Sequence, residues 1–178
     1  HLGQIALAGE AGLETAADFH LNAYNHRTIR FLAAAGACRV TFSLEVDARE
    51  AVRVAARAAG VETEVVAGGS VFSMLTRQDY GLPRGGRFTA VSEHGHPYRF
   101  ETSPTGITTL AEARELVGAA ALPILAGSVD SVRLDLAHLG AAAVGEIATA
   151  YREALEALLD TGGGASSSGD GPPGPPQG

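Results

Sequence analysis

The chain of 178 residues contains no lysine, so all 13 of its basic residues are arginine. This absence excludes a Schiff-base lysine, a Walker lysine and a serine–lysine dyad within the chain. With 20 acidic residues the formal net charge is −7. Such a balance argues against broad nucleic-acid binding through neutralisation of phosphates.

Cysteine is almost absent as well. Cys38 is the single cysteine, which excludes an internal disulfide and a cysteine-clustered metal site. No apolar run has membrane-spanning length and no signal peptide is visible, so we predict a bacterial-type cytoplasmic protein without membrane contact. The length suits one domain. Because the chain opens at His1 and not at a methionine, we interpret it as the C-terminal part of a longer domain.

Residues 19–46 show the clearest alternation of sheet and helix. Alternating apolar residues predict a strand over residues 19–23, a helical spacing follows and ends at Gly36, and residues 39–43 return to a strand pattern. A strand, a helix and a strand in so few residues predict a right-handed parallel crossover. The chemistry of such units lies just past the carboxyl ends of their strands.

Similar units recur along the chain. We predict parallel strands at residues 4–8, 19–23, 39–43, 63–67 and 131–136, and helices at residues 48–59, 109–117 and 144–159. A Gly-centred turn between two β patterns predicts a hairpin over residues 87–102. The predicted fold class is therefore α/β, a partial (β/α) TIM-like barrel with parallel strands and an inserted β-hairpin.

The two ends of the chain differ in character. Residues 1–160 form the predicted domain portion, whereas residues 161–178 are rich in Gly, Ser and Pro and predict a disordered tail. A half-barrel would leave the strand at 4–8 with an unpaired edge bearing Ile5 and Leu7. Exposed edges favour association, so we expect the chain to self-associate when it is alone.

Four segments together resemble the collagenase-like peptidase family (peptidase family U32). Leu21-Asn-Ala-Tyr-Asn25, a helix and Arg39-Val-Thr-Phe-Ser-Leu-Glu45 are similar to that family's "LN..N" and "RvtLS.E" run. Glu64 to Met74 is similar to its next strand, residues 88–100 to its short hairpin, and Val132-Arg-Leu-Asp135 to its late "lRlD" strand. The resemblance covers roughly residues 4–159, through the order and spacing of these motifs.

The resemblance implies one of two functions. The first is a peptidase-like hydrolase that acts on a peptide or another polar polymer at the carboxyl ends of the barrel strands. The second is an accessory or substrate-binding domain, related to members that support hydroxylation of RNA bases or of a quinone precursor. Those members hold an iron–sulfur cluster with four cysteines. Here the corresponding positions fall on Phe72, on Asp79 and near Thr105 or Gly106, so thiolate ligation is impossible within the chain and we expect no cofactor.

Polar residues near the predicted strand ends are the candidate site. Glu45 could act as a general base, with Ser43 and Asn22 as further catalytic candidates. We expect four residues to contact substrate: Glu10, Asn25, His26 and Asp135. No metal site is predicted.

Each candidate also has a structural alternative. The Asn residues can cap the helix that follows them. His94 and His96 lie in a predicted turn, where two histidines without a third ligand are usually solvated. Cys38 lies in an apolar stretch that favours packing. Arg133 shares a strand face with Asp135, which is compatible with an internal ion pair.

Overall fold

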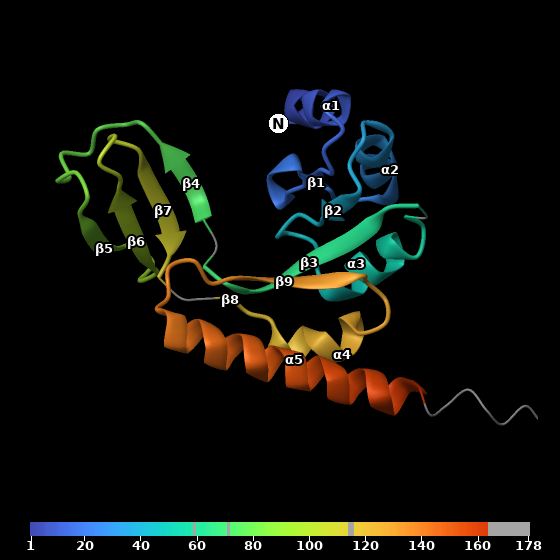
Figure 1. Ribbon diagram of the computed structural model, residues 1–178. Coiled ribbons are helices and arrows are strands. Elements are labelled where there is room, and N and C mark those ends of the chain that lie inside the picture. Colours follow the sequence, from blue (N-terminus) through green and yellow to red (C-terminus); the bar gives the residue numbers. More distant parts are fainter. Residues whose placement is uncertain (59, 71, 114–115, 164–178) are drawn as a thin grey trace, which may run out of the picture.

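The computed structural model describes residues 1–58, 60–70, 72–113 and 116–163 of the chain. Figure 1 shows two open sheets beside each other, with the helices gathered around one of them. The elements in chain order are α1 (Leu2–Glu10), β1 (Ala16–Ala17), η1 (Phe19–Leu21), α2 (His26–Ala34), β2 (Arg39–Thr41), α3 (Ala48–Ala55), β3 (Glu62–Gly69), β4 (Phe72–Thr76), β5 (Arg87–Val91), β6 (Pro97–Thr102), β7 (Thr108–Glu112), β8 (Leu116–Val117), η2 (Ala119–Ala121), α4 (Leu122–Leu125), β9 (Ser131–Asp135) and α5 (Ala141–Gly163).

The first sheet places four parallel strands in the order β1–β2–β3–β9. β2 pairs with Glu62 to Glu64, and the short antiparallel strand β8 pairs further along with Gly68 and Gly69. Because β9 occupies the other edge of β3, β2 and β8 share one edge. The predicted parallel strands at 39–43, 63–67 and 131–136 are thereby confirmed.

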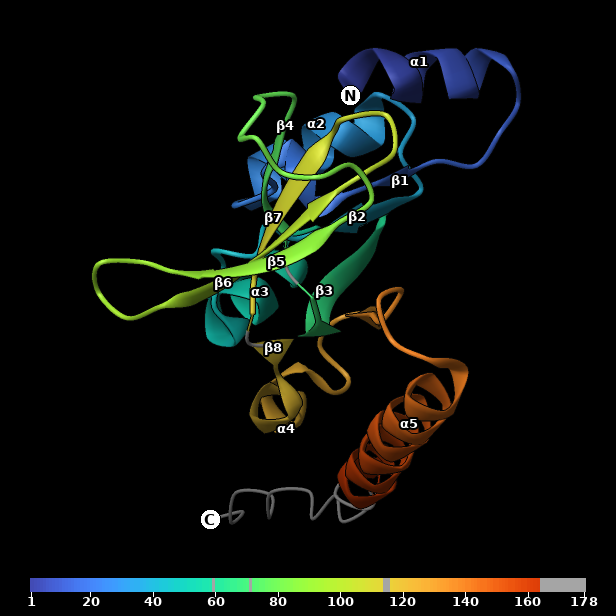
Figure 2. The ribbon, with the colours of Figure 1, turned by 90° about the vertical axis from the view of Figure 1, so that its left-hand side faces the viewer.

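One face of this parallel sheet packs against helices. Val40, Phe42 and Val132 contribute to a core with α2, α3 and α4, whose buried members include Ile29, Leu32, Ala51, Val54 and Leu125. Figure 2 shows α4 and α5 on the same side of the strands. Residues of a strand alternate between its two faces, so Arg39, Thr41, Glu64 and Arg133 lie on the face without these helices.

The predicted helix at residues 48–59 is confirmed as α3 (Ala48–Ala55). Asp47 Oδ1 accepts a hydrogen bond from Glu50 N at 2.9 Å at the start of α3, as its spacing predicted. The long last helix is also confirmed, since α5 covers the predicted residues 144–159 and extends to Gly163. Residues 164–178 of the predicted tail lie outside the described residues.

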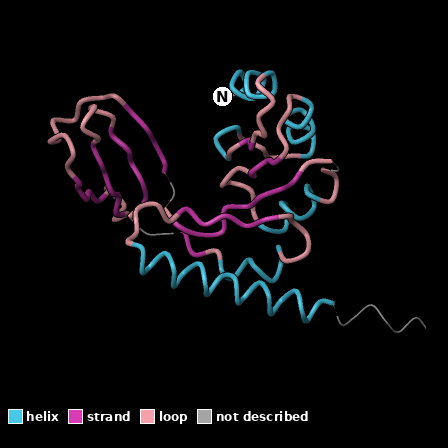
Figure 3. The backbone as a smooth tube through the Cα atoms, in the orientation of Figure 1, coloured by secondary structure: helices cyan, strands magenta, loops and turns pink. Residues whose placement is uncertain are grey.

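The second sheet is antiparallel, in the order β4–β7–β6–β5. The predicted hairpin is confirmed as β5 and β6, with Phe88 opposite Phe100. Figure 3 shows the strands of this sheet in magenta at the left, apart from the helices in cyan. The predicted helix at 109–117 is wrong. β-branched residues at 108 and 109 begin β7 instead, which pairs with both β6 and β4. A hydrogen bond of 2.6 Å from Arg99 Nη2 to Ser70 Oγ links this sheet to the end of β3.

Two predicted strands near the start of the chain are also wrong. Residues 4–8 lie in α1, where Ile5 is 2% exposed and Leu7 65% exposed, as one buried helical face requires. A short apolar run does not by itself distinguish a helix from a strand. Ile5 and Leu7 are therefore not on a sheet edge. Residues 19–23 form η1 and an isolated bridge at Ala23, because the chain bulges out of the sheet there.

The architecture is mixed α/β with parallel and antiparallel strands. The strands of residues 1–58, 60–70, 72–113 and 116–163 form two open sheets and do not close into a barrel. None of the helices in these residues is both long and apolar enough to cross a membrane.

Candidate functional site

A bulge between β1 and β2 gives the sheet its most unusual local geometry. Ala17 pairs with Val40, and the next contact joins Ala23 to Phe42. The segment after β1 thus has five residues, 18–22, between these two contacts, whereas β2 has one residue, Thr41, between them. Bulges in sheets are frequent next to functional sites because they redirect side chains. Here the extra residues place Asp18, Phe19 and His20 beside the open face of the parallel sheet.

Arg133 connects this bulge to the far edge of the parallel sheet. Its Nη2 donates to Asp18 Oδ1 at 2.9 Å, and its Nη1 lies 3.5 Å from Glu64 Oε1. The guanidinium carbon also lies 5.3 Å from the ring centre of Phe19, within cation–π range. The side chain therefore reaches from β9 past β3 and β2 and fixes the position of the bulge.

Glu64 is the central and most buried carboxylate of this face, with 9% of its side chain exposed. It accepts a hydrogen bond from Thr41 Oγ1 at 2.8 Å and a longer one from Ser131 Oγ at 3.4 Å. Arg39 lies 3.8 Å from Glu64 and donates to Glu62 at 2.7 Å. We call Asp18, Arg39, Glu62, Glu64 and Arg133 the charged cluster.

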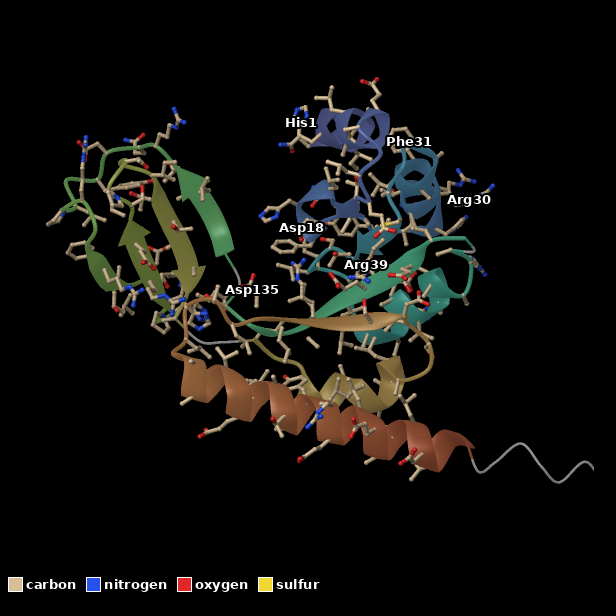
Figure 4. All side chains as sticks on the ribbon, in the orientation of Figure 1. His1, Asp18, Arg30, Phe31, Arg39 and Asp135 are labelled. Atoms are coloured by element: carbon tan, nitrogen blue, oxygen red, sulfur yellow. The ribbon has the colours of Figure 1, made fainter. Side chains whose placement is uncertain are left out.

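The charged cluster is anchored at one end and open at the other. In Figure 4, Asp18 and Arg39 lie above the parallel sheet, away from α4 and α5, and Asp135 lies further along β9 toward the antiparallel sheet. The side chains of Asp18 and Arg39 are 47% and 41% exposed. A polar ligand can therefore reach the charged cluster from solvent at Asp18 and Arg39. Glu64, at the buried side of the cluster, contacts both Arg39 and Arg133.

Asp18 and Asp130 both ionise more easily than ordinary carboxyl groups. Partial burial acts to raise the pKa of Asp18, but hydrogen bonds from His20, Arg133 and the Phe19 amide outweigh it and lower the pKa below its usual 3.8. The backbone N–H of Thr63, and then its hydroxyl, donate to Asp130 Oδ2 at 2.7 and 2.8 Å and lower the pKa of Asp130.

These lowered pKa values predict loss of stability in acid. A carboxyl whose pKa is lower in the folded chain contributes stability that is complete above its ordinary pKa, 3.8, and is lost as the pH falls through the folded value. We expect the free energy of unfolding to decline below pH 3.8 and Asp130→Asn to reduce that decline, measured by urea unfolding at several pH values. Asp160→Asn is the control, because its carboxylate has no hydrogen-bond partner among the described residues. An unchanged decline in Asp130→Asn would contradict the assignment.

Asp18 and His20 form a dyad on the bulge. His20 Nδ1 lies 3.0 Å from Asp18 Oδ2, and the His20 ring stacks on Phe19 at 4.1 Å between centroids. An ionised carboxylate only accepts hydrogen bonds, so Nδ1 carries the proton of this contact. In the neutral ring Nε2 is then bare and can accept a proton. The His20 side chain is 65% exposed.

The structure brings four of the predicted site residues to the carboxyl ends of the parallel strands, which we call the carboxyl edge. Asn22 follows β1 and is the only described non-glycine residue with positive φ, at 53°. Ser43 N donates to Ala23 O at 3.2 Å, which ties the end of β2 to the bulge. Glu45 lies two residues further, and Asp135 ends β9. Asn22, Glu45 and Asp135 make no side-chain hydrogen bond with other described residues, so these three remain available to a ligand.

Ser43, although at this edge, is engaged by its neighbours, and the remaining candidates are engaged elsewhere or lie away from the edge. Ser43 is 6% exposed and its hydroxyl faces the Glu45 amide at 3.5 Å, which disfavours it as a nucleophile. Asn25 caps α2 by accepting from Arg27 N and Thr28 N, both at 3.0 Å. His26 begins the same helix.

Glu10 does not follow a strand. It ends α1, ahead of β1, so the reason for placing it at the carboxyl edge no longer holds.

Histidine and cysteine supply no further site in the described residues. His94 and His96 lie in the β5–β6 turn and are exposed. Cys38 is exposed rather than buried, and its thiol contacts Thr15 O at 3.4 Å. The described part of the chain contains no group of three His, Cys, Asp or Glu residues that could hold a metal ion.

Sequence reasoning missed Asp18, His20 and Glu64. The first two were obscured because residues 19–23 were interpreted as a regular strand. Glu64 could have been found from the alternation of Glu62 and Glu64 on one face of β3, with Arg39 opposite Glu62 on β2 and Arg133 two residues beyond the partner of Glu64 on β9. Comparison with models of known families, with curated proteins and with solved structures finds no significant match.

Proposed function

We propose that the chain is a hydrolase of the kind found in the collagenase-like peptidase family, acting on a peptide at the carboxyl edge of the parallel sheet, and that this open sheet is part of a (β/α) barrel. The observation that carries the proposal is the Asp18–His20 dyad, 3.0 Å between Nδ1 and Oδ2, on an exposed bulge. An imidazole held by a carboxylate is a suitable general base.

The described side chains suit a mechanism without a covalent intermediate. His20 Nε2 takes a proton from water while the water oxygen attacks the scissile carbonyl; the C–N bond then breaks and His20 returns the proton to the leaving amine. Asp18 holds the ring, and Arg133 holds Asp18. Asn22, at the end of the same bulge, is the candidate donor for the carbonyl oxygen. Glu45 is the alternative base, since its carboxylate is unpaired at the same edge.

A second observation supports the relationship to this family. The positions matched to its cluster cysteines include Asp79 and Thr105 or Gly106, which are separated by 26 residues or more. These three residues line one cavity in the antiparallel sheet. Two ligand positions of a single cluster would have to lie close together in this way, which supports the alignment although neither position holds a cysteine.

Hydrolysis of gelatin and of short peptides by the purified chain tests the proposal. A general base contributes roughly 100- to 10,000-fold to a rate, so His20→Ala should lower kcat by about that factor. Asp18→Asn should lower kcat less, because the ring remains but loses its orientation. His94→Ala, in the exposed β5–β6 turn, is the matched control and should retain full activity.

Three outcomes separate the alternatives. Loss of activity in Glu45→Gln with retention in His20→Ala would make Glu45 the base. Full activity in both variants would overturn the assignment to this edge. Peptide binding without turnover would favour an accessory or substrate-binding domain, a candidate that the 65% exposure of His20 supports because water is not excluded there.

A further inference from the structure

A cavity of substantial size in the described residues lies away from the charged cluster, in the antiparallel sheet. It has a volume of about 440 Å³, opens to solvent, and is lined by the β4–β5 loop, the β6–β7 turn and the adjoining ends of β6 and β7. In Figure 1 these loops lie at the upper left, whereas α1 and α2 lie at the upper right. A volume of this size is typical of sites for small molecules.

The β4–β5 loop is held in place on both sides of the cavity. Gly81 N donates to Asp79 Oδ1 at 2.8 Å, which closes the turn at the first wall. Next to Arg84, Gly85 N donates to Thr102 O at 2.7 Å, and Thr102 N donates back to Gly86 O at 3.0 Å. These bonds fix the backbone on which Arg84 stands.

The β6–β7 turn forms the facing wall and is equally constrained. Ser103 N donates to Ile107 O at 2.8 Å, and Ile107 N donates to Ser103 Oγ at 3.0 Å. The Arg84 guanidinium lies against this turn, since a Cβ built at Gly106 would be 3.9 Å from its Nε and Nη2. The cavity is therefore formed before a ligand binds, which reduces the cost of ordering.

Two arginines without a carboxylate partner line this cavity. Arg39, Arg53, Arg87 and Arg133 all form ion pairs, whereas Arg77 and Arg84 form none with the described residues. The one acidic residue in the lining is Asp79, and its Oδ1 already accepts from Gly81 N. Arg77 and Arg84 stand at the same cavity, so an anion bound there would supply the negative charge that both guanidinium groups lack in the described residues.

We propose that this cavity binds a small phosphate-bearing ligand, with Arg77 and Arg84 holding the phosphate. Guanidinium groups bind phosphate oxygens through paired N–H donors, and two of them balance the charge of a phosphate dianion, whereas a carboxylate carries a single charge. Tyr80 and Leu82 supply an apolar wall for the rest of the ligand. The Tyr80 ring is held edge-on against Phe100, 6.3 Å between centroids. The inference does not depend on hydrolysis at the carboxyl edge.

Calorimetric titration of the full chain with phenyl phosphate tests this site. The probe combines a dianion with a ring that can contact Tyr80. Arg77→Gln and Arg84→Gln should each raise the Kd at least tenfold, and added salt should weaken binding to the original chain. Arg30→Gln is the matched control, because Arg30 is an exposed, unpaired arginine on α2, far from this sheet (Figure 4), and its Kd should stay unchanged.

Further measurements distinguish between classes of ligand and test whether the variants are still folded. Inorganic phosphate should compete with phenyl phosphate, whereas acetate at equal ionic strength should not. Unchanged melting temperatures in both cavity variants would show that weaker binding is local; if a variant melts early, chemical-shift mapping of the amides of residues 77–84 and 102–108 in the original chain replaces it. Equal competition by acetate, an equal loss of binding in Arg30→Gln, or shifts confined to other residues would overturn the proposal.

Discussion

Gly69→Ala should reduce the free energy of unfolding by roughly 3–5 kcal/mol, because two separate penalties meet at this residue. Gly69 ends β3 with φ +106°, a conformation that favours glycine. A Cβ there would lie 2.0 Å from the carbonyl oxygen and 2.5 Å from the carbonyl carbon of Asp135. That carbonyl is backbone and also accepts from Ser70 N at 3.0 Å, so β9 cannot move away without losing this bond. Urea unfolding followed by circular dichroism measures the loss.

Gly127→Ala is the matched control for backbone strain. Gly127 also has a positive φ, 72°, but no atom lies within 4 Å of a Cβ built there. Only the conformational penalty of about 1–2 kcal/mol should therefore appear. Equal losses in the two variants would show that the close approach of β3 and β9 adds nothing to the cost of Gly69→Ala.

The parts of the fold that could be predicted are those with a local signal. Asp47 with Glu50 marks the start of α3, and the apolar stripe of α5 continues over several turns. The sequence of α1 has neither a capping-box spacing nor an apolar stripe over several turns. Its run from Gln4 to Ala8 is too short to show a period, and packing of Ile5 into the core decides its conformation. In short apolar segments, tertiary contacts outweigh the pattern.

The prediction of a helix where β7 lies was wrong for a related reason. Thr109 and Glu112 have the spacing of a capping box, which is a local signal for a helix. The segment instead pairs on both sides, with Thr109 opposite Glu101 on β6 and opposite Leu75 on β4. Such pairing depends on strands distant in sequence, and a cap of this kind contributes only about 1 kcal/mol. The part of the antiparallel sheet beyond the β5–β6 hairpin, which lies at one edge, could therefore not be predicted from local patterns.

The candidate site residues likewise divide into those that a local sequence pattern predicts and those that depend on contacts distant in sequence. Asn22, Glu45 and Asp135 could be named from the sequence because each follows a strand pattern, and strand ends of a parallel sheet meet at one edge. Asp18 and His20 depend on the bulge, which replaces one residue of a regular strand by five. The partners of Arg133 depend on the order of strands across the sheet. The nearest acidic neighbour in its own strand, Asp135, is not one of them.

Replacing Arg133 tests whether the charged cluster holds the sheet and the bulge together. Arg133→Met keeps much of the apolar stem but removes the charge facing Glu64 and Asp18. Removing one partner of a fully buried ion pair costs about 3–5 kcal/mol, and because Asp18 is half exposed we expect about 2–4 kcal/mol here. Arg87→Met is the control, since Arg87 and Glu101 form an exposed pair that should contribute less than about 1 kcal/mol.

A double-mutant cycle with Glu64→Gln separates this pairing from simple loss of packing. If Arg133 stabilises the chain by compensating the buried Glu64 carboxylate, the double variant should be less destabilised than the sum of the single variants, by about 1–2 kcal/mol. Glu64→Gln retains an oxygen that can accept from Thr41, so the contacts that change are those with Arg133 at 3.5 Å and with Arg39 at 3.8 Å. Additive losses within about 0.5 kcal/mol would mean that the two side chains act independently. Arg133 would then stabilise the bulge through Asp18 and Phe19 alone, and Asp18→Asn should reproduce most of its effect.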